Sequence, residues 1–301
     1  MNSIAIILVI ASCVTHAGWN FVCKSKTPSA AFFAISTCSS LVALTPVFLY
    51  FIPRLGQVPL ALWGLLIVTG FFQALYYISL GNSYRLNDIS LAYPISRSLP
   101  VLMVPLICFL IGYGKPLSLL AIMGMIVTAV GCMILPLKII NTSVFKQYFQ
   151  YSFLFVVLAS VGTAGYSIID SMGLELLKTG AHPLSTMQAA LFYIAFEDLA
   201  TLLFLWPYVW SSRREKINLR IIRKRSLRYP LLAGPVVSVT YTLVLLAMQF
   251  ATNVSYIVAF RQVSILVGVL LGIFVLKEKS TPFKITGTAL IFAGLVLAAL
   301  G

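Results

Sequence analysis

The chain has 301 residues, of which 60% are hydrophobic and only 9% are charged, and its mean hydropathy is +1.00. A soluble domain is excluded, because soluble domains carry about 25% charged residues. The formal net charge of +14 would suit a nucleic-acid partner, but the basic residues gather at the ends of apolar segments, so we expect no nucleic-acid partner.

Ten apolar segments follow one another, each long enough to cross a bilayer as a helix of about 20 residues. In chain order they cover residues 3–22, 30–52, 59–81, 89–111, 116–137, 150–174, 184–210, 229–250, 255–276 and 282–300. No basic residue precedes the first segment within the sequence, so we expect it to be retained rather than cleaved as a signal. We therefore predict an all-α integral membrane protein with ten transmembrane helices, multi-pass in the plasma (inner) membrane.

The basic residues predict how the helices are oriented. Of the 21 Lys and Arg residues, two lie inside apolar segments and nineteen remain. Sixteen of these lie in or beside connections that follow odd-numbered segments, eight of them between Arg213 and Arg228, and three lie in the other connections. The positive-inside rule then places the odd-numbered connections in the cytoplasm and both chain ends outside. The loop of eight basic residues is an anchor for this topology and can also touch anionic headgroups.

The two arginines inside apolar segments are Arg97 and Arg261. A charged side chain at membrane depth costs roughly 2.5–3.5 kcal/mol on insertion scales, so it usually marks a pathway or a ligand site. A guanidinium offers a fork of donors that fits a carboxylate or a phosphonate. The alternative is an arginine neutralised by a nearby acid, with a purely structural role.

The two arginines have different local sequences. Arg97 lies among Pro94, Pro100 and Pro105, whereas no proline flanks Arg261 in its segment. Proline removes a helical hydrogen bond and clashes with the preceding turn. We therefore expect a bent helix around Arg97, an unbroken one around Arg261, and Arg97 as the principal substrate contact.

Three of the seven acids lie inside apolar segments: Asp170, Glu197 and Asp198. Asp170 follows Tyr166 by four residues and Glu197 follows Tyr193 by four, so each acid shares a helix face with a tyrosine. Such an acid could pair with an arginine, take up a coupling proton, or hold a substrate amine. Adjacent helical residues point about 100° apart, so Glu197 and Asp198 do not face one site together, and we prefer Glu197.

Further candidates lie in the first, third and eighth segments. His16 and Asn20 share one helix face, and Trp19 lies beside them; His16 is either a protonation switch or a neutral histidine bonded between helices. Tyr76 and Tyr241 occupy matching places in the two halves of the chain, which favours a cavity role. The five cysteines form no CxxC or Cys/His cluster, so we expect neither a disulfide framework nor a metal site.

The two halves of the chain resemble each other. A shift of 165 residues superposes Tyr76 on Tyr241, with Arg97 and Arg261 one position out of register, and Gly124 and Gly131 share their spacing with Gly287 and Gly294. We predict two five-helix repeats, residues 1–141 and 142–301. An odd number of helices per repeat inverts the second copy, an architecture typical of carriers with a site at mid-membrane. Duplication that only enlarges a helical bundle is the alternative.

No catalytic motif is present: the chain contains no Walker loop, HExxH or GxSxG sequence. We therefore expect no enzyme and no cofactor. A membrane-embedded enzyme or receptor remains as an alternative from another functional class, and binding without translocation would favour it.

Several short motifs resemble the EamA-like family of the drug/metabolite transporter superfamily. They are the run His16-Ala17-Gly18-Trp19-Asn20 with Lys24, the run Ala92-Tyr93-Pro94 ahead of Arg97, and the run from Ala164 to Asp170. The resemblance covers essentially the whole chain and implies a ten-helix carrier. Within the family, the first and last motifs look like members associated with phosphonate-type metabolites. The run Lys277-Glu278-Lys279 before the last segment also looks like the Gly-Glu turn that is common in this superfamily. The first repeat reads Gly114-Lys115-Pro116 at the corresponding place and lacks the acid.

Together these observations predict a secondary carrier that moves a small anionic or zwitterionic metabolite, such as an amino acid or aminophosphonate, by alternating access. Arg97 and Arg261 would bind the acidic end, and Asp170 or Glu197 would bind an amine or a coupling proton. The cavity lining would include His16, Trp19, Asn20, Tyr76, Tyr166 and Tyr241. A lipid-headgroup flippase or a multidrug exporter of the same superfamily is the alternative, although two arginines would repel cationic drugs. We expect a monomer or a dimer.

Overall fold

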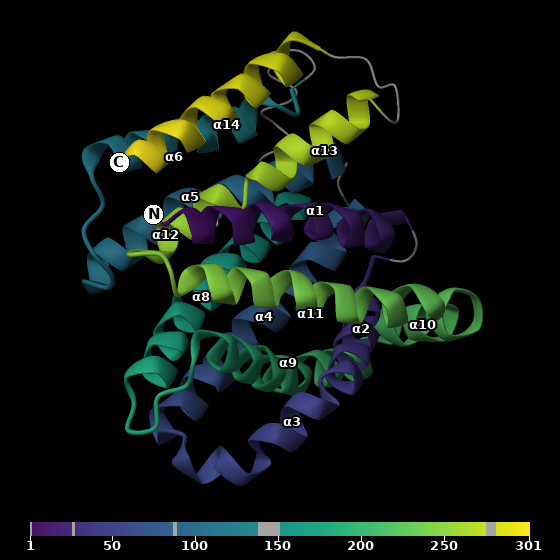
Figure 1. Cartoon of the computed structure of the whole chain (residues 1–301). Helices are drawn as coiled ribbons and strands as arrows, with labels where there is room; N and C mark the ends of the chain where they lie inside the picture. Colours follow the sequence, from purple (N-terminus) through teal and green to yellow (C-terminus); the bar gives the residue numbers. More distant parts are fainter. Residues whose placement is uncertain (1, 26–27, 87–88, 138–150, 275–280) are drawn as a thin grey trace.

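The computed structural model describes residues 2–25, 28–86, 89–137, 151–274 and 281–301, and within these ranges the chain forms helices and no strand (Figure 1). This confirms the all-α prediction. The helices are α1 (Ser3–Ser25), α2 (Ala30–Ala43), α3 (Thr45–Phe51), the 3₁₀ helix η1 (Ile52–Gln57), α4 (Leu60–Leu86), α5 (Ile89–Ile111), α6 (Leu119–Ile134), α8 (Tyr151–Thr179), α9 (Thr186–Ser211), α10 (Arg213–Ile221), the π-helical turn η2 (Ile222–Ser226), α11 (Arg228–Met248), α12 (Val254–Phe260), α13 (Val263–Phe274) and α14 (Pro282–Leu300).

By length and composition, the chain is a multi-pass membrane protein. Within the described ranges, five helices are long and apolar enough to cross a membrane: α4, α8, α9, α11 and α14. A sixth span results if α2 and the segment Thr45–Gln57, which are bent by 56° from each other, are counted together. The other expected spans also form apolar helices, which are shorter in the part of the chain that the structure describes.

The connections gather at two opposite ends of the bundle. At one end, Asn253 Nδ2 donates to Lys115 O at 2.9 Å, joining the connection after α5 to the one after α11. At the other end, Ala31 N at the start of α2 donates to Glu215 of α10 at 2.9 Å. Figure 1 shows both chain ends on the side of the bundle opposite α10. Segments that are far apart in the chain therefore meet at each end of the bundle.

Helices α6 and α14 lie side by side through their glycines (Figure 1). A Cβ atom at Gly131 would lie 2.7 Å from Ile291 N and 2.8 Å from Gly287 O, and one at Gly124 would lie 2.6 Å from Gly294 O. Only the absence of side chains lets the two backbones approach so closely, as in other membrane helix pairs with small residues. The four glycines whose shared spacing is visible in the sequence therefore form the interface between α6 and α14.

The prediction of an unbroken helix around Arg261 is wrong, whereas α5 is not interrupted at its prolines. Helix α5 runs continuously through Pro94, Pro100 and Pro105, because a membrane helix tolerates the loss of single hydrogen bonds where its freed groups find other partners. The break lies instead at Arg261 and Gln262, between α12 and α13. There the pattern tightens: Gln262 N donates to Ala259 O, Ser264 N to Arg261 O and Ile265 N to Gln262 O. Arg261 O also accepts hydrogen bonds from the side chains of Ser264 and Arg97.

Candidate functional site

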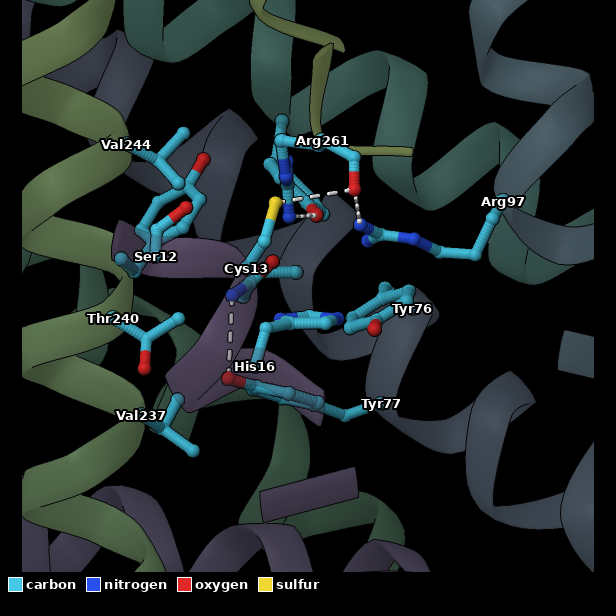
Figure 2. A pocket seen from close by; sticks show the side chains of 13 residues that line it. Ser12, Cys13, His16, Tyr76, Tyr77, Arg97, Val237, Thr240, Val244 and Arg261 are labelled. Carbon is cyan, nitrogen blue, oxygen red and sulfur yellow. Dashed lines mark hydrogen bonds between the residues drawn. The ribbon is translucent and has the colours of Figure 1, made fainter. Parts of the chain in front are cut away.

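A small polar cavity lies in the middle of the bundle, lined by residues of α1, α4, α5, α8, α11 and the α12–α13 break (Figure 2). Arg97 is eight residues into α5, about 12 Å along the helix axis at 1.5 Å per residue, which is close to mid-membrane. The free space is about 20 Å³, room for about one water molecule. The lining residues are Ser12, Cys13, His16, Gln73, Tyr76, Tyr77, Arg97, Tyr166, Val237, Thr240, Tyr241, Val244 and Arg261.

Arg97 reaches across the cavity to the helix break. Its Nη2 donates to Arg261 O at 3.0 Å (Figure 2). The same Nη2 also donates to Ser264 Oγ at 3.3 Å. The Arg261 carbonyl lies at the C-terminal end of α12, where a cation is favourable because the exposed carbonyls carry partial negative charge. Arg97 Nε is buried and has no hydrogen-bond partner within the described ranges. Arg97 therefore stabilises the break and still has a donor available.

Arg261 is held by aromatic side chains. Its Nη2 donates to the Tyr166 hydroxyl at 3.1 Å, and its guanidinium lies 5.8 Å from the Tyr166 ring centroid and 5.7 Å from that of Tyr241. Cation–π contacts of this kind stabilise a charge that is withdrawn from water. Arg261 Nη1 is buried and has no partner among the described residues.

No carboxylate of a described residue lies within 4.0 Å of either guanidinium. Asp170 follows Tyr166 by four residues in α8. It is separated from Arg261 by Tyr166, which bonds to Arg261, and by Tyr241, which bonds to Asp170. It accepts hydrogen bonds from Thr69 and from the Tyr241 hydroxyl and does not line the cavity. The site therefore presents two positive groups with spare N–H donors and no direct counter-ion.

The two acids of α9 have different surroundings. Asp198 accepts a hydrogen bond from Ser40, whose hydroxyl also bonds to Ser238. Asp198 lines a second cavity of about 10 Å³, which adjoins the central one because Tyr77 borders both. Glu197 is 1% exposed, lines neither cavity, and neither of its carboxyl oxygens has a partner within the described part of the chain. Of the two, the structure brings Asp198 rather than Glu197 next to the site.

The other predicted residues are placed as follows. His16 and Tyr76 line the cavity, together with Tyr166 and Tyr241. The Tyr166 ring lies edge-on to both Tyr76 and Tyr241, with centroids 5.7 and 5.6 Å apart. The side chains of Trp19 and Asn20 lie outside the described residues.

Several lining residues escaped the sequence reasoning, among them Cys13, Gln73, Tyr77 and Thr240. Cys13 is buried, and its Sγ lies 3.5 Å from Arg261 O. The signal that could have found Tyr77 is the register of the repeat. A shift of 164 instead of 165 residues relates Tyr77 to Tyr241 and also Arg97 to Arg261.

A wider cavity of about 620 Å³ lies beyond the central one, at the end of the bundle opposite α10. Met248 of α11 and Ser171 of α8 line it, and they are four and five residues beyond Val244 and Tyr166 of the central cavity, about 6 and 7.5 Å along the helices. Lys115, Lys178 and Glu175 lie around it. We call it the vestibule.

No family model and no curated protein matches the chain. Among solved structures, one described as "Crystal structure of protein" matches with a TM-score of 0.62 and 17% identity, over 100% of this chain and 99% of the matched chain. At this identity the similarity concerns the fold alone. The arrangement of helices along the whole chain therefore recurs in a solved protein.

Proposed function

We propose that the chain is a secondary carrier of a small anionic or zwitterionic metabolite, such as an amino acid or aminophosphonate, and that it belongs to the EamA-like family. The observation that carries the proposal is the convergence of Arg97 and Arg261 on one buried cavity, each with a spare N–H donor and without a carboxylate in contact. Two uncompensated charges at membrane depth are costly, and an anionic group would satisfy both.

The lining of the cavity supports a ten-helix inverted repeat. Four pairs of lining residues are separated by 164 positions in the chain: Gln73 and Val237, Tyr76 and Thr240, Tyr77 and Tyr241, Arg97 and Arg261. Each half contributes one member of every pair. A site shared in this way between two copies is what an inverted repeat places at mid-membrane.

Close backbone contacts follow the same relation. Gly70 of α4 packs on Ala200 of α9, and Gly234 of α11 packs on Ser36 of α2. Both 234 − 70 and 200 − 36 equal 164, so one contact becomes the other when the halves are exchanged. In the same way α4 packs on α8, and α11 packs on α1.

The size of the cavity supports alternating access. A space of about 20 Å³ does not admit a metabolite, so substrate entry requires the helices to move apart. The vestibule lies about one helical turn beyond the cavity, and Lys115 and Lys178 would draw anions toward it. We propose that the halves rock about the cavity, which is occluded in the conformation described here.

Transport by purified protein in liposomes tests the proposal. The unmodified carrier should take up at least one member of a panel of amino acids and phosphonates, and Arg97→Gln and Arg261→Gln should each reduce its apparent affinity. Loss of a charge-assisted hydrogen bond costs about 1.5–3 kcal/mol, a factor of about 10–150. The control is Arg54→Gln, because Arg54 is an exposed residue of η1 that stacks on Tyr50 far from the cavity. Full transport of every accepted substrate by Arg97→Gln would refute the proposal.

A flippase for lipid headgroups is a second candidate, which one observation favours. An apolar groove of about 660 Å³ between α5 and α6 joins the vestibule, since Tyr113, Gly114, Lys115 and Asn253 border both. A lipid tail in this groove would leave its headgroup at the vestibule. This candidate predicts that uptake requires an acyl or prenyl chain, whereas the carrier predicts uptake of free metabolites.

A further inference from the structure

We propose that the exposed face of α10 and of the turn η2 binds anionic phospholipid headgroups of the adjacent leaflet. This inference depends on the placement of the chain in a membrane and not on the substrate that it moves. It assigns a lipid-binding role to a segment that makes no contact with the central cavity.

Helix α10 is fixed to the bundle by its one acidic residue. Glu215 is 4% exposed, accepts a hydrogen bond from Ala31 N at 2.9 Å through Oε2, and accepts another from Asn218 at 3.1 Å through Oε1. The Ser212 hydroxyl caps the helix by accepting from Glu215 N. Because the carboxylate is turned inward and satisfied, it does not neutralise the basic side chains on the outer face.

The outer face has a basic strip beside an apolar strip. At 100° per residue, Arg213, Lys216 and Arg220 fall within one 60° sector of α10. All three are exposed, as are Arg223 and Lys224 of η2. Neighbouring positions on the same face carry Ile217 and Ile221, which are 55% and 42% exposed. A helix with basic and apolar exposed strips is typical of segments that lie in a membrane interface.

Aromatic residues place α10 at headgroup depth. Trp206 and Trp210 stack on each other near the end of α9, with ring centroids 5.5 Å apart, and Trp210 is 61% exposed. Tryptophan is enriched where the hydrocarbon core meets the headgroups. Helix α10 begins three residues after Trp210, and α11 re-enters the apolar region from Arg228. The basic strip therefore lies beside the phosphates of the leaflet.

The basic residues on this face favour an anionic phospholipid over a neutral one. Guanidinium groups bind phosphate oxygens through two parallel hydrogen bonds. Each basic residue near an anionic bilayer surface strengthens binding about fivefold, so three residues together account for a factor of about 100. Neutral phosphatidylcholine also presents a phosphate, but its choline cation cancels this gain. The face therefore discriminates in favour of phosphatidylglycerol over phosphatidylcholine.

The test uses purified full-length protein in nanodiscs, where both leaflets have the same composition. Phosphatidylglycerol added to phosphatidylcholine should raise the thermal midpoint of unfolding, and about 1 M salt should abolish the rise. The rise should disappear in the triple variant Arg220→Gln/Arg223→Gln/Lys224→Gln. It should persist in the control Arg54→Gln, which removes a basic residue that lies at the opposite end of the bundle and does not line the vestibule.

Two results would overturn the proposal: an undiminished rise in the triple variant, or an equal rise when inorganic phosphate is added to pure phosphatidylcholine nanodiscs. The second would mean that the face binds anions in general. If the triple variant does not fold, Arg223→Gln alone should lower the ratio of phosphatidylglycerol to phosphatidylcholine that copurifies, about fivefold, and an unchanged ratio counts against the proposal. Transport is not measured, so a failure here is distinct from a failure of the carrier proposal.

Discussion

Replacement of Tyr241 by phenylalanine would remove one oxygen from a contact that joins three helices. The Tyr241 hydroxyl of α11 donates to one carboxyl oxygen of Asp170 on α8, and Thr69 of α4 donates to the other. The aromatic ring would keep its edge-on packing against Tyr166, with centroids 5.6 Å apart. The variant therefore changes the hydrogen bond and little else.

The loss of stability in Tyr241→Phe depends on whether the acceptor, the Asp170 carboxyl group, is ionised. A hydrogen bond to a charged group contributes about 1.5–3 kcal/mol, whereas polar contacts between membrane helices average about 0.6 kcal/mol. When the Asp170 carboxyl group is ionised, both hydroxyls donate to it, because a carboxylate only accepts. We therefore expect Tyr241→Phe to lower the free energy of unfolding by about 1.5–3 kcal/mol.

Reversible unfolding in mixed micelles, combined with a double-mutant cycle, would measure this value. In an Asp170→Asn background the cost of Tyr241→Phe should fall by more than half, since the charged acceptor is gone. Tyr256→Phe is a control: Tyr256 is 6% exposed, and the hydrogen bonds to Asp170 come from Thr69 and Tyr241 instead. A cost below about 0.6 kcal/mol, or an equal cost in both backgrounds, would refute the reasoning.

Two further predictions concern the interface between α6 and α14 and the connection after α5. Gly131→Val should destabilise the α6–α14 pair by at least 1–3 kcal/mol in the same unfolding assay, since its Cβ would meet backbone atoms of α14 at 2.7 and 2.8 Å. Gly64→Val, where nothing lies within 4 Å, is the control, and equal costs would contradict the packing argument. In the connection after α5, burial raises the pKa of Tyr113 from 10.0 to about 12, with a smaller contribution from nearby Glu175. Because the folded state holds this proton more tightly, its contribution to stability is complete below pH 10 and is lost as pH rises through 12. In unfolding curves recorded at alkaline pH, Tyr113→Phe should lose less stability than the unmodified protein as pH rises from 10 to 12. Identical curves for the two proteins would contradict the raised pKa of Tyr113.

The helices and the intramembrane arginines follow from local sequence. Long apolar runs predict helices because a backbone in lipid must satisfy its own hydrogen bonds. Arg97 and Arg261 stand out because a charge in such a run is costly whatever surrounds it. The structure brings both to one cavity, together with His16, Tyr76 and other predicted residues.

The position of the helix break needed the tertiary structure. Sequence reasoning placed it at the prolines of α5, whereas it lies at Arg261, where the carbonyl accepts from Arg97. A proline lowers the local cost of a bend, but a bend forms where partners from other helices satisfy the freed groups. The donor is 164 residues away in the chain, so no local pattern reveals it.

The roles of the acids were likewise decided by packing. Asp170, Glu197 and Asp198 look equivalent in the sequence, as lone carboxyls in apolar helices. In the structure Asp170 is bonded to Thr69 and Tyr241, Asp198 is bonded to Ser40, and Glu197 has no partner among the described residues. The sequence by itself determined that charges are buried in a helical membrane protein. Which groups meet each charge depends on contacts between distant helices, and only the tertiary structure decides those contacts.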